Sequence, residues 1–459
     1  MKRTTSRLAA FALTGALVLA SCGGDDSAST TEAPAPGTEA PATDAPGTDA
    51  PATDAPAESW AVNPDDCADP EAPNAPIEGT VKIGSVLPLS GGTAALAFAP
   101  VRDGMEAYVK YANENKILGD VTIELQVEDD QYNKDLTPGA VDKLLDGEVN
   151  LVTGIVGTPD NLAVRDTLNE ECVPQLLALT GSPEWGHVDE YPWTTGALVP
   201  YDVESKAYAK AIHELFPDGA KVALFTVNSD FGAAYVDAFK EIASDPASGI
   251  EIVDEQTIDA AASEPPTAQV NAIAAKAPDA ILAVPLGAQC PSFLSTVTEA
   301  KAANAGWEPK VFLTATCASS LILSVAGPAA DGLYTSNNLV DINNPDYSSL
   351  PKVKEYVDYM TAQGKADVAT TAGAGWNVIE TTVEILRIAS ESPEGLTRAS
   401  IMNAARNYAY APMLGRPGVE LKMNGADDAY QAQSLQVVQY NATTKIFTDI
   451  TDVITEFES

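Results

Sequence analysis

Short apolar runs alternate with segments of helical spacing from residue 77 onward, and this alternation constrains the fold more than any other feature of the chain. Strand-like runs lie at 81–89, 121–127, 149–156, 174–179, 221–227, 250–258, 280–284 and 311–314. Segments with helical spacing lie at 101–115, 138–145, 161–169, 204–216, 233–243, 267–276, 291–303 and 371–390. Repeated strand–helix–strand order predicts an α/β fold with parallel sheets flanked by helices on both faces.

The alternation occurs in two successive series, which predicts two similar lobes. With 459 residues, the chain is long enough for two or three domains. Near the end, strand-like runs at 434–440 and 445–450 flank an Asn-Ala-Thr-Thr turn. We expect these runs to form a hairpin that completes one of the lobes.

The N-terminal segment has the pattern of an export signal. Basic residues near the start precede an apolar stretch at 8–20, which is too short to span a membrane. The sequence Leu-Ala-Ser-Cys-Gly at 19–23 resembles a bacterial lipobox. This resemblance implies a signal peptide of residues 1–21 and lipid attachment to Cys22, which would hold the protein at the outer face of the cell membrane. An ordinary secretory signal that contains a cysteine is the alternative.

Residues 22–76 lack the apolar pattern of the rest of the chain. Residues 25–58 consist mostly of Ala, Pro, Thr, Gly, Asp and Glu and contain no lysine or arginine. A segment of this composition cannot bury a core, so we expect a disordered, extended tether between the lipidated cysteine and the lobes.

The strong negative charge excludes one class of partner. The net charge of −39 argues against binding to nucleic acid, because a phosphate backbone requires a basic surface. We expect no metal and no cofactor, since EF-hand, Walker A, GxSxG and HExxH patterns are absent from the sequence. The charge is then that of a soluble, self-repelling surface.

Four cysteines remain if Cys22 carries lipid: Cys67, Cys172, Cys290 and Cys317. An even number in an exported protein predicts disulfides, and four cysteines allow three connectivities. A zinc site is the alternative, but the cysteines form no CxxC pairs and the two histidines are isolated.

The order of the features is similar to that of a known family. VKIGSVLPLSGGTA, a strand that ends in Glu-Asp-Asp, VNLVTGIVGTPDN, VPQLLALTGSPEW and VALFTVNSDFGAAYVDAFKE follow one another as in type I periplasmic binding proteins. The chain resembles the leucine-type, branched-chain amino-acid-binding proteins of ABC transporters. This resemblance implies two Rossmann-like lobes, a hinge of three crossovers and a ligand cleft between the lobes. We expect lobe one at 77–197 and 334–410, and lobe two at 198–333 and 411–459.

Ligands of open α/β sheets bind at the carboxyl ends of strands, so the loops after the strands are the candidate site. In the first lobe these loops offer hydroxyl groups and the backbone N–H groups of helix starts, which suit a carboxylate or a neutral polar group. The resemblance implies that the loops of Thr158 and Thr180 hold the polar head of the ligand. The alternative is that these hydroxyls only cap helices. The candidate residues of this lobe are Ser90, Gly91, Thr93, Gly157, Thr158, Thr180 and Gly181.

In the second lobe the candidates are Phe231, Gln289 and Thr316, which follow strand-like runs. The resemblance implies that Phe231 packs on the ligand, with a place in the core of the lobe as the alternative. Amino-acid-binding members carry an acid near the position of Thr316, and none is present here. Either another acid such as Asp230 replaces it, or the ligand is an amide, a urea-like compound or a small organic acid. Trp376 either roofs the pocket or packs in the core.

The expected fold selects one pairing of the cysteines. Cys290 and Cys317 each follow a strand of the second lobe, and they can bridge if those strands are neighbours. Cys67 and Cys172 would then join the incoming linker to the first lobe.

The predicted function is that of an extracytoplasmic solute-binding lipoprotein that captures a small polar ligand by hinge closure. Its expected partners are an ABC permease and its ATPases, and we expect a monomer. A ligand sensor of the same fold is one alternative. A secreted enzyme that uses Glu128, Asp129 and Asp130 as acid–base groups is another, but a solvated strand end that matches the double aspartate of the family is the favoured explanation of these residues.

Overall fold

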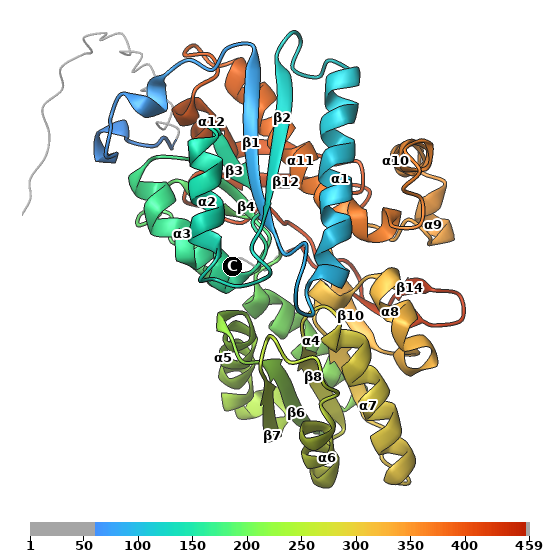
Figure 1. Ribbon diagram of the computed structural model, residues 1–459. Helices are drawn as coiled ribbons and strands as arrows, with labels where there is room; N and C mark the ends of the chain where they lie inside the picture. Colours follow the sequence, from blue (N-terminus) through green and yellow to red (C-terminus); the bar gives the residue numbers. More distant parts are fainter. Residues whose placement is uncertain (1–59, 456–459) are drawn as a thin grey trace, which may run out of the picture. The chain divides into compact units, whose positions relative to one another are not determined.

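The computed structural model describes residues 60–455. The expected signal peptide, Cys22 and the tether up to residue 59 therefore lie outside the described residues. The predicted α/β class with two lobes is confirmed: the described part of the chain contains two large sheets flanked by helices and one two-stranded sheet (Figure 1).

The first lobe contains a five-stranded parallel sheet of order β2-β1-β3-β4-β5. Its strands are β1 (Thr80–Leu87), β2 (Thr122–Asp129), β3 (Leu151–Thr153), β4 (Gln175–Ala178) and β5 (Thr194–Gly196). Parallel central strands are buried on both faces, which explains why the residues of β1, β3 and β4 form nearly continuous apolar runs.

Helices cover both faces of this sheet. The helices are α1 (Ala95–Glu114), α2 (Thr137–Asp146), α3 (Thr158–Glu170), α9 (Pro345–Ser348), α10 (Pro351–Ala362), α11 (Ala369–Ser390) and α12 (Arg398–Ala405). Figure 1 shows α2 and α3 on one face and α1 with α11 on the other. Two glycines permit the close packing of α1 on α11, because a Cβ atom at Gly104 would lie 1.9 Å from the Ala372 carbonyl and one at Gly375 equally close to that of Val101.

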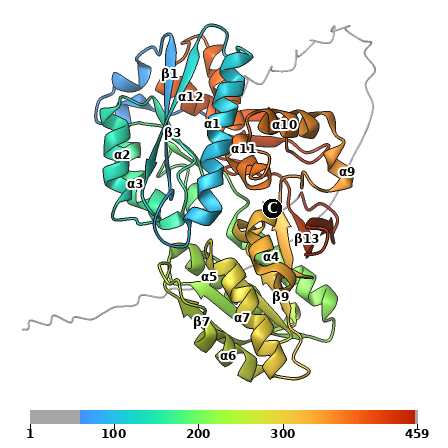
Figure 2. The same ribbon diagram turned by 45° about the vertical axis from the view of Figure 1, so that its right-hand side comes forward.

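The second lobe contains a seven-stranded sheet of order β14-β13-β10-β9-β8-β6-β7. Its strands are β6 (Ala220–Val227), β7 (Ile250–Ile258), β8 (Ala280–Val284), β9 (Lys310–Leu313), β10 (Tyr334–Asn337), β13 (Gln436–Asn441) and β14 (Ile446–Asp449). Pairing is parallel from β7 to β10, and the expected terminal hairpin β13–β14 adds two antiparallel strands. The helices are α4 (Tyr201–Leu215), α5 (Asp230–Ser244), α6 (Thr267–Lys276), α7 (Gln289–Ala303) and α8 (Ser320–Ala326). Figure 2 shows α6 and α7 along one side of this sheet, where they share a core with α8, while α4 and α5 share the core of the other side.

The chain passes between the two sheets three times: between β5 and α4, after β10, and before β13. Strand β10 belongs to the second sheet, whereas the expected boundary at 334 placed it in lobe one. Strands β11 (Asn407–Tyr410) and β12 (Leu421–Asn424) pair with each other, and their apolar side chains join the core of the first lobe. We therefore propose lobe boundaries near 338 and 429 in place of 334 and 411.

Both expected disulfides are present. Cys67 is bonded to Cys172, with Cα atoms 5.6 Å apart, and Cys290 is bonded to Cys317, with Cα atoms 6.1 Å apart. Cys67 belongs to residues 60–76, which we assigned to the tether but which lie against the first lobe. The N–H of Val62 donates to Asn403 Oδ1 (2.8 Å). The lobe therefore begins before the first strand.

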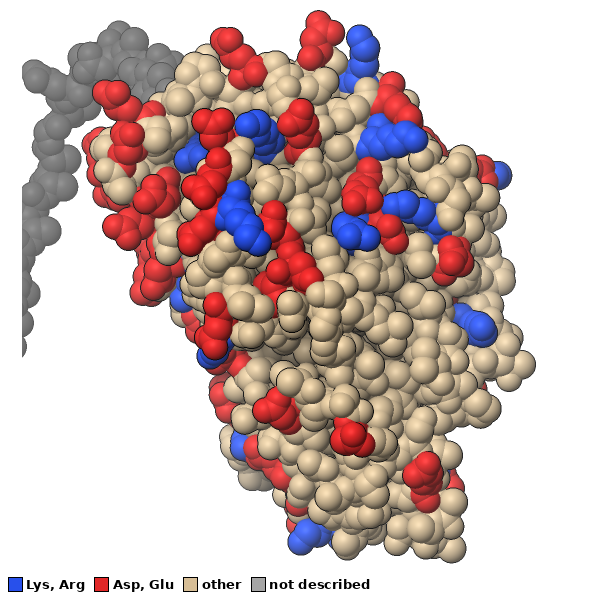
Figure 3. Space-filling model, in the orientation of Figure 1, with Lys and Arg blue, Asp and Glu red and all other residues tan. Residues whose placement is uncertain are grey.

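Acidic side chains are spread over both lobes on the face drawn in Figure 3, with basic ones among them over the first lobe. No broad basic patch is visible on that face. Within residues 60–455, no helix is long and apolar enough to cross a membrane.

Candidate functional site

The loop after β1 contacts the second lobe. The Thr93 carbonyl accepts a hydrogen bond from the Ala288 N–H (2.8 Å), and the Thr93 hydroxyl donates to the Ala260 carbonyl (3.3 Å). Gly287 has a φ of +52°, and a Cβ atom there would lie 2.1 Å from the Thr93 oxygen. The two lobes are thus in contact at a position that only glycine fits.

The Gln289 side chain stabilises the backbone of the second lobe at this contact. Its Nε2 donates to the Asp259, Ala260 and Ala262 carbonyls at 2.9, 3.3 and 2.9 Å, and its Oε1 accepts from the Leu286 N–H. The side chain, which is buried, therefore braces the loop on which Thr93 docks.

Ser90 and Gly91 shape the same loop from the first lobe. The Ser90 hydroxyl donates to Asp129 Oδ2, and the N–H groups of Leu89, Ser90 and Gln131 donate to Oδ1. Burial acts to raise the pKa of Asp129, but the bond from Ser90 and those from the backbone outweigh it and lower the pKa. Gly91 has a φ of +68° and packs on Gln131. The N–H and hydroxyl groups of Ser90 therefore form hydrogen bonds within the turn.

Thr158 and Thr180 come together as the sequence predicts. Their hydroxyls are 2.6 Å apart and buried. The phenol of Tyr201, on the first turn of α4, lies beside both hydroxyls. The Tyr201 N–H donates to the Gly181 carbonyl (2.7 Å), so the crossover between the lobes is attached to this loop.

Phe231 is buried against Tyr201. Their ring centroids are 5.3 Å apart. The Tyr235 ring stacks on the Tyr201 ring, with centroids 4.4 Å apart. Ser229 caps α5 by accepting the Gly232 N–H (3.4 Å), which orients Phe231 at the start of the helix. Tyr201 therefore contacts the hydroxyls of the first lobe and the aromatic side chains of the second.

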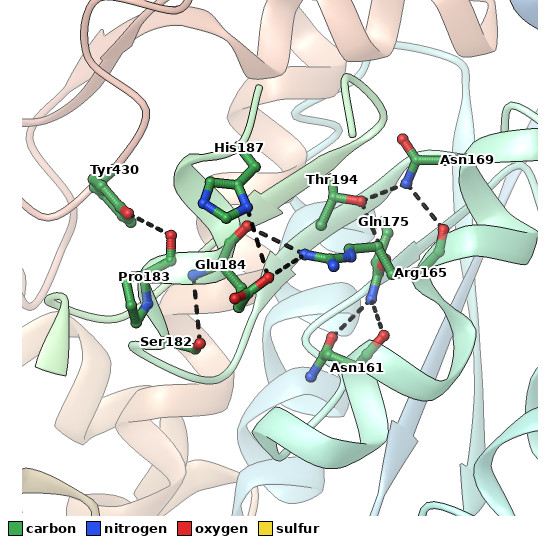
Figure 4. A network of polar contacts seen from close by, with 10 residues as sticks. All are labelled: Asn161, Arg165, Asn169, Gln175, Ser182, Pro183, Glu184, His187, Thr194 and Tyr430. Carbon is green, nitrogen blue, oxygen red and sulfur yellow. Dashed lines mark hydrogen bonds and ion pairs between the residues drawn. The ribbon is translucent and has the colours of Figure 1, made fainter. Parts of the chain in front are cut away.

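Polar side chains hold the start of α3, as Figure 4 shows. Asn161 Nδ2 donates to the Gly157 carbonyl (2.7 Å), and its Oδ1 accepts from Gln175 Nε2 (2.9 Å). Arg165 forms an ion pair with Glu184 (3.1 Å) and lies 3.5 Å from the Tyr191 ring centroid. These contacts fix the loop that carries Gly157 and Thr158.

A pair of buried carboxyl groups lies next to this loop, and the sequence reasoning missed one of them. The Thr137 hydroxyl is 2.9 Å from Asp130 Oδ2 and 3.2 Å from Asp160 Oδ1. Burial, with the neighbouring Asp130, raises the pKa of Asp160 to about 8, and burial also raises that of Asp130. Burial thus favours the protonated form of both carboxyl groups, which face the same hydroxyl. A Cβ atom at Gly157 would lie 2.2 Å from Asp160 Oδ2.

Glu204 lies next to Thr316, where the sequence around Thr316 itself contains no acidic residue. Its Oε1 accepts from the Ala315 N–H (2.9 Å), beside Thr316, and from the Tyr208 hydroxyl (2.5 Å). Its Oε2 accepts from the Tyr235 hydroxyl (2.7 Å). Burial raises the pKa of Glu204 in spite of these donors. The spacing of Glu204 and Tyr208 on one helix face was the only sequence signal for this arrangement.

A cavity of about 250 Å³ is lined by Tyr201 and by further residues of both lobes and of the crossovers. Thr316 lines it, and its hydroxyl is 3.2 Å from that of Thr314. The other nine predicted ligand residues do not line it.

Two further expectations concern Trp376 and the acidic strand end. Trp376 is buried among Tyr108, Tyr111, Tyr356 and Tyr359, so it packs in the core. In the Glu128–Asp130 stretch, Glu128 forms an ion pair with Lys143, Asp129 closes the turn and Asp130 belongs to the buried pair. Among residues 60–455, no cluster of His, Cys, Asp and Glu has the geometry to hold a metal ion.

Comparisons with known proteins give one family. Residues 80–445 match the family described as periplasmic binding protein. A comparison with curated protein sequences gave no match.

Solved structures of solute-binding proteins share the fold. A branched-chain amino-acid ABC transporter protein from Thermus thermophilus with bound valine has a TM-score of 0.73 and 21% identity, and the match covers 83% of this chain and 97% of that chain. A fatty acid ABC transporter substrate-binding protein from Thermomonospora curvata has a TM-score of 0.69, 17% identity and coverages of 84% and 95%. An R. palustris solute-binding protein in complex with benzoate has a TM-score of 0.68, 19% identity and coverages of 82% and 98%. These proteins bind solutes for ABC transporters and are not enzymes.

Proposed function

The chain belongs to the periplasmic binding protein family, and from this premise we propose that it is an extracytoplasmic solute-binding lipoprotein that captures a small polar ligand between its lobes and delivers it to an ABC importer. The observation that carries the proposal is the meeting of Thr158 and Thr180 with Tyr201 and Phe231, because it joins hydroxyl groups of one lobe to aromatic rings of the other.

The ligand's polar head binds at the start of α3. Separation of the lobes would expose the hydroxyls of Thr158 and Thr180 together with the first N–H groups of that helix, which suit a carboxylate or an amide oxygen. Asp160 Oδ2, which has no hydrogen-bond partner among the described residues, accepts a donor of the ligand. An amino acid, an amide or a urea-like compound has both kinds of group.

Ligand binding favours the closed arrangement through contacts that the open arrangement lacks. Thr93 with Ala288 is one such contact, and the approach of the Tyr201 phenol to Thr158 and Thr180 is another. The expected partners are one small molecule per monomer, a permease and its ATPases, while lipid on Cys22 holds the protein at the membrane.

A thermal-shift screen with amino acids, amides, ureas and short organic acids tests the proposal. A compound at 100 times its dissociation constant stabilises the folded protein by about 2.7 kcal/mol. For a compound found in this way, we expect Thr158→Ala and Thr180→Ala each to weaken binding without loss of folding, while Thr180→Ser, which keeps the hydroxyl, binds nearly as the wild type does. Unchanged affinity in both alanine variants would remove these loops from the site.

Lipid attachment needs its own test. Cells that express the full chain are labelled with an alkyne-bearing fatty acid, and the protein is detected after gel electrophoresis. We expect label on the wild type and none on Cys22→Ser. Label on that variant would contradict lipidation at Cys22.

A further inference from the structure

The cavity that Tyr201 lines has walls from both lobes. Phe98 and Val101 of α1, Ile322 of α8, and Leu339 and Val340 of the second crossover give it a largely apolar surface. The Ser319 and Thr371 hydroxyls, 2.5 Å apart, join the two lobes at the cavity wall. Contents of the cavity therefore contact both lobes at once.

Its volume suits a small molecule. At about 250 Å³ the cavity is larger than the roughly 150 Å³ apolar cavity that is known to admit benzene in another protein. A six-membered ring with a short substituent, or an alkyl chain of similar size, fills such a space. Because the walls are apolar, most of the molecule must be apolar as well.

The amide oxygen of Asn377 is one of the buried polar atoms of the wall that lack a hydrogen-bond partner among the described residues. Asn377, on α11, is 6% exposed, and its Oδ1 has no hydrogen bond within the described part of the chain. A buried amide oxygen without a donor is unfavourable, so a ligand that brings a donor to it gains free energy.

The ionisable groups on the wall are acids. Glu204 and Asp341 line the cavity, and no lysine or arginine does. The carboxylate of Asp341 accepts the N–H groups of Asn343 and Phe447 (3.0 Å each), and Glu204 is held by its two tyrosines and Ala315. A carboxylate ligand would be buried beside two carboxyl groups with no lysine or arginine on the wall to pair with it, which is unfavourable.

We propose that this cavity is a second binding site, separate from the Thr158–Thr180 cluster, for a small apolar alcohol or amine. The ring or alkyl body fills the apolar space, and the hydroxyl or ammonium group donates to Asn377 Oδ1. Since the walls come from both lobes, the bound molecule favours their contact, and occupancy of this site promotes closure at the other.

Titration calorimetry on the full chain tests the proposal with three isosteric probes: benzyl alcohol, benzylamine and benzoate. We expect heat of binding with the alcohol and the amine, and an affinity for benzoate at least tenfold weaker. Equal affinity for benzoate, or binding of none of the three, would overturn the proposal.

Variants locate the site. Ala374→Leu extends a side chain into the cavity and should abolish binding of benzyl alcohol. Asn377→Leu should weaken benzyl alcohol roughly tenfold and leave toluene binding as strong as in the wild type, because only the alcohol uses the amide. Unfolding is monitored for both, and either variant suffices if the other fails to fold.

The control is the double variant Thr158→Ala, Thr180→Ala, which alters the other cluster. We expect it to bind benzyl alcohol as the wild type does. A loss of benzyl alcohol affinity in this variant, with no effect of Ala374→Leu, would place the probe in the polar cleft and refute a second site.

Discussion

The Ala288 N–H donates to the Thr93 carbonyl at 2.8 Å, and this bond joins the loop after the first strand to the start of α7 in the other lobe. Glycine at position 287 makes the approach possible, since any Cβ atom there would collide with the Thr93 oxygen. The approach of these two loops thus depends on the missing side chain at position 287.

Gly287→Ala is expected to separate the lobes. The added Cβ atom would lie 2.1 Å from the Thr93 carbonyl, so the contact must open. We expect a larger radius of gyration in small-angle X-ray scattering and at least tenfold weaker ligand binding. Gly306→Ala is the matched control, because Gly306 also has a positive φ, +89°, but has no atom within 4 Å of a Cβ position. Equal behaviour of the two variants would show that backbone strain alone is responsible.

Asp160 is expected to make stability depend on pH. Its pKa is raised from 3.8 to about 8 in the folded protein, so its contribution is complete below the unfolded pKa and is lost as the pH rises through about 8. Asp160→Asn should remove much of this decline and raise Tm at pH 8 by on the order of 5 °C. Calorimetric melting between pH 5 and 9 measures it.

Asp129→Asn is the control for that experiment. Because the pKa of Asp129 is lowered, its contribution has the opposite sign: it is present above the unfolded pKa and lost as the pH falls through the folded pKa. This variant should lose stability at neutral pH and keep the decline toward pH 8. A decline that is unchanged in Asp160→Asn would refute the assignment to Asp160.

Glu204→Gln is expected to destabilise the second lobe. The carboxylate accepts from Tyr208, Tyr235 and the Ala315 N–H, whereas a glutamine presents an NH₂ group to one of these donors. We expect a loss of about 1–3 kcal/mol in the free energy of unfolding, measured by urea denaturation. Glu214→Gln, on an exposed position of the same helix, should change stability little. A similar loss in both variants would contradict a special role of Glu204.

The two disulfides should differ in their contribution to stability. Cys67 and Cys172 are 105 residues apart, and Cys290 and Cys317 are 27 apart. Because loop entropy in the unfolded chain grows with loop length, replacing the first pair by alanine should cost about 1 kcal/mol more than replacing the second. Thermal unfolding of the two double variants measures the difference, and the reverse order would refute a dominant role of loop entropy.

The periodicity of the sequence predicted the bounds of those strands and helices that depend mainly on neighbouring residues in the chain. The bounds of β7, α6 and β8 coincide with the predicted ones, because each apolar run is bounded by turn residues. The lobe boundaries differed, since the membership of β10 and β12 depends on partners far along the chain.

The candidate site was predictable only in part for the same reason. The approach of Thr158 to Thr180 follows from neighbouring parallel strands, which sequence order indicates. Asp160 and Asn377 have ordinary helical surroundings in the sequence. The burial of Asp160 Oδ2 and Asn377 Oδ1 without a hydrogen-bond partner among the described residues arises only when other elements pack around them. Ser90 and Gln289 have the residue types of ligand-binding groups but form hydrogen bonds within the protein.

The docking of residues 60–67 on the first lobe has a mechanical consequence. Asn407 holds the Trp60 carbonyl, Arg406 lies over the Trp60 ring, and Cys67 is covalently joined to Cys172. Tension applied from the N-terminal side is therefore transmitted to one lobe only and bypasses the hinge. If the lobes open and close as proposed, the second lobe would move without pulling on the N-terminal attachment.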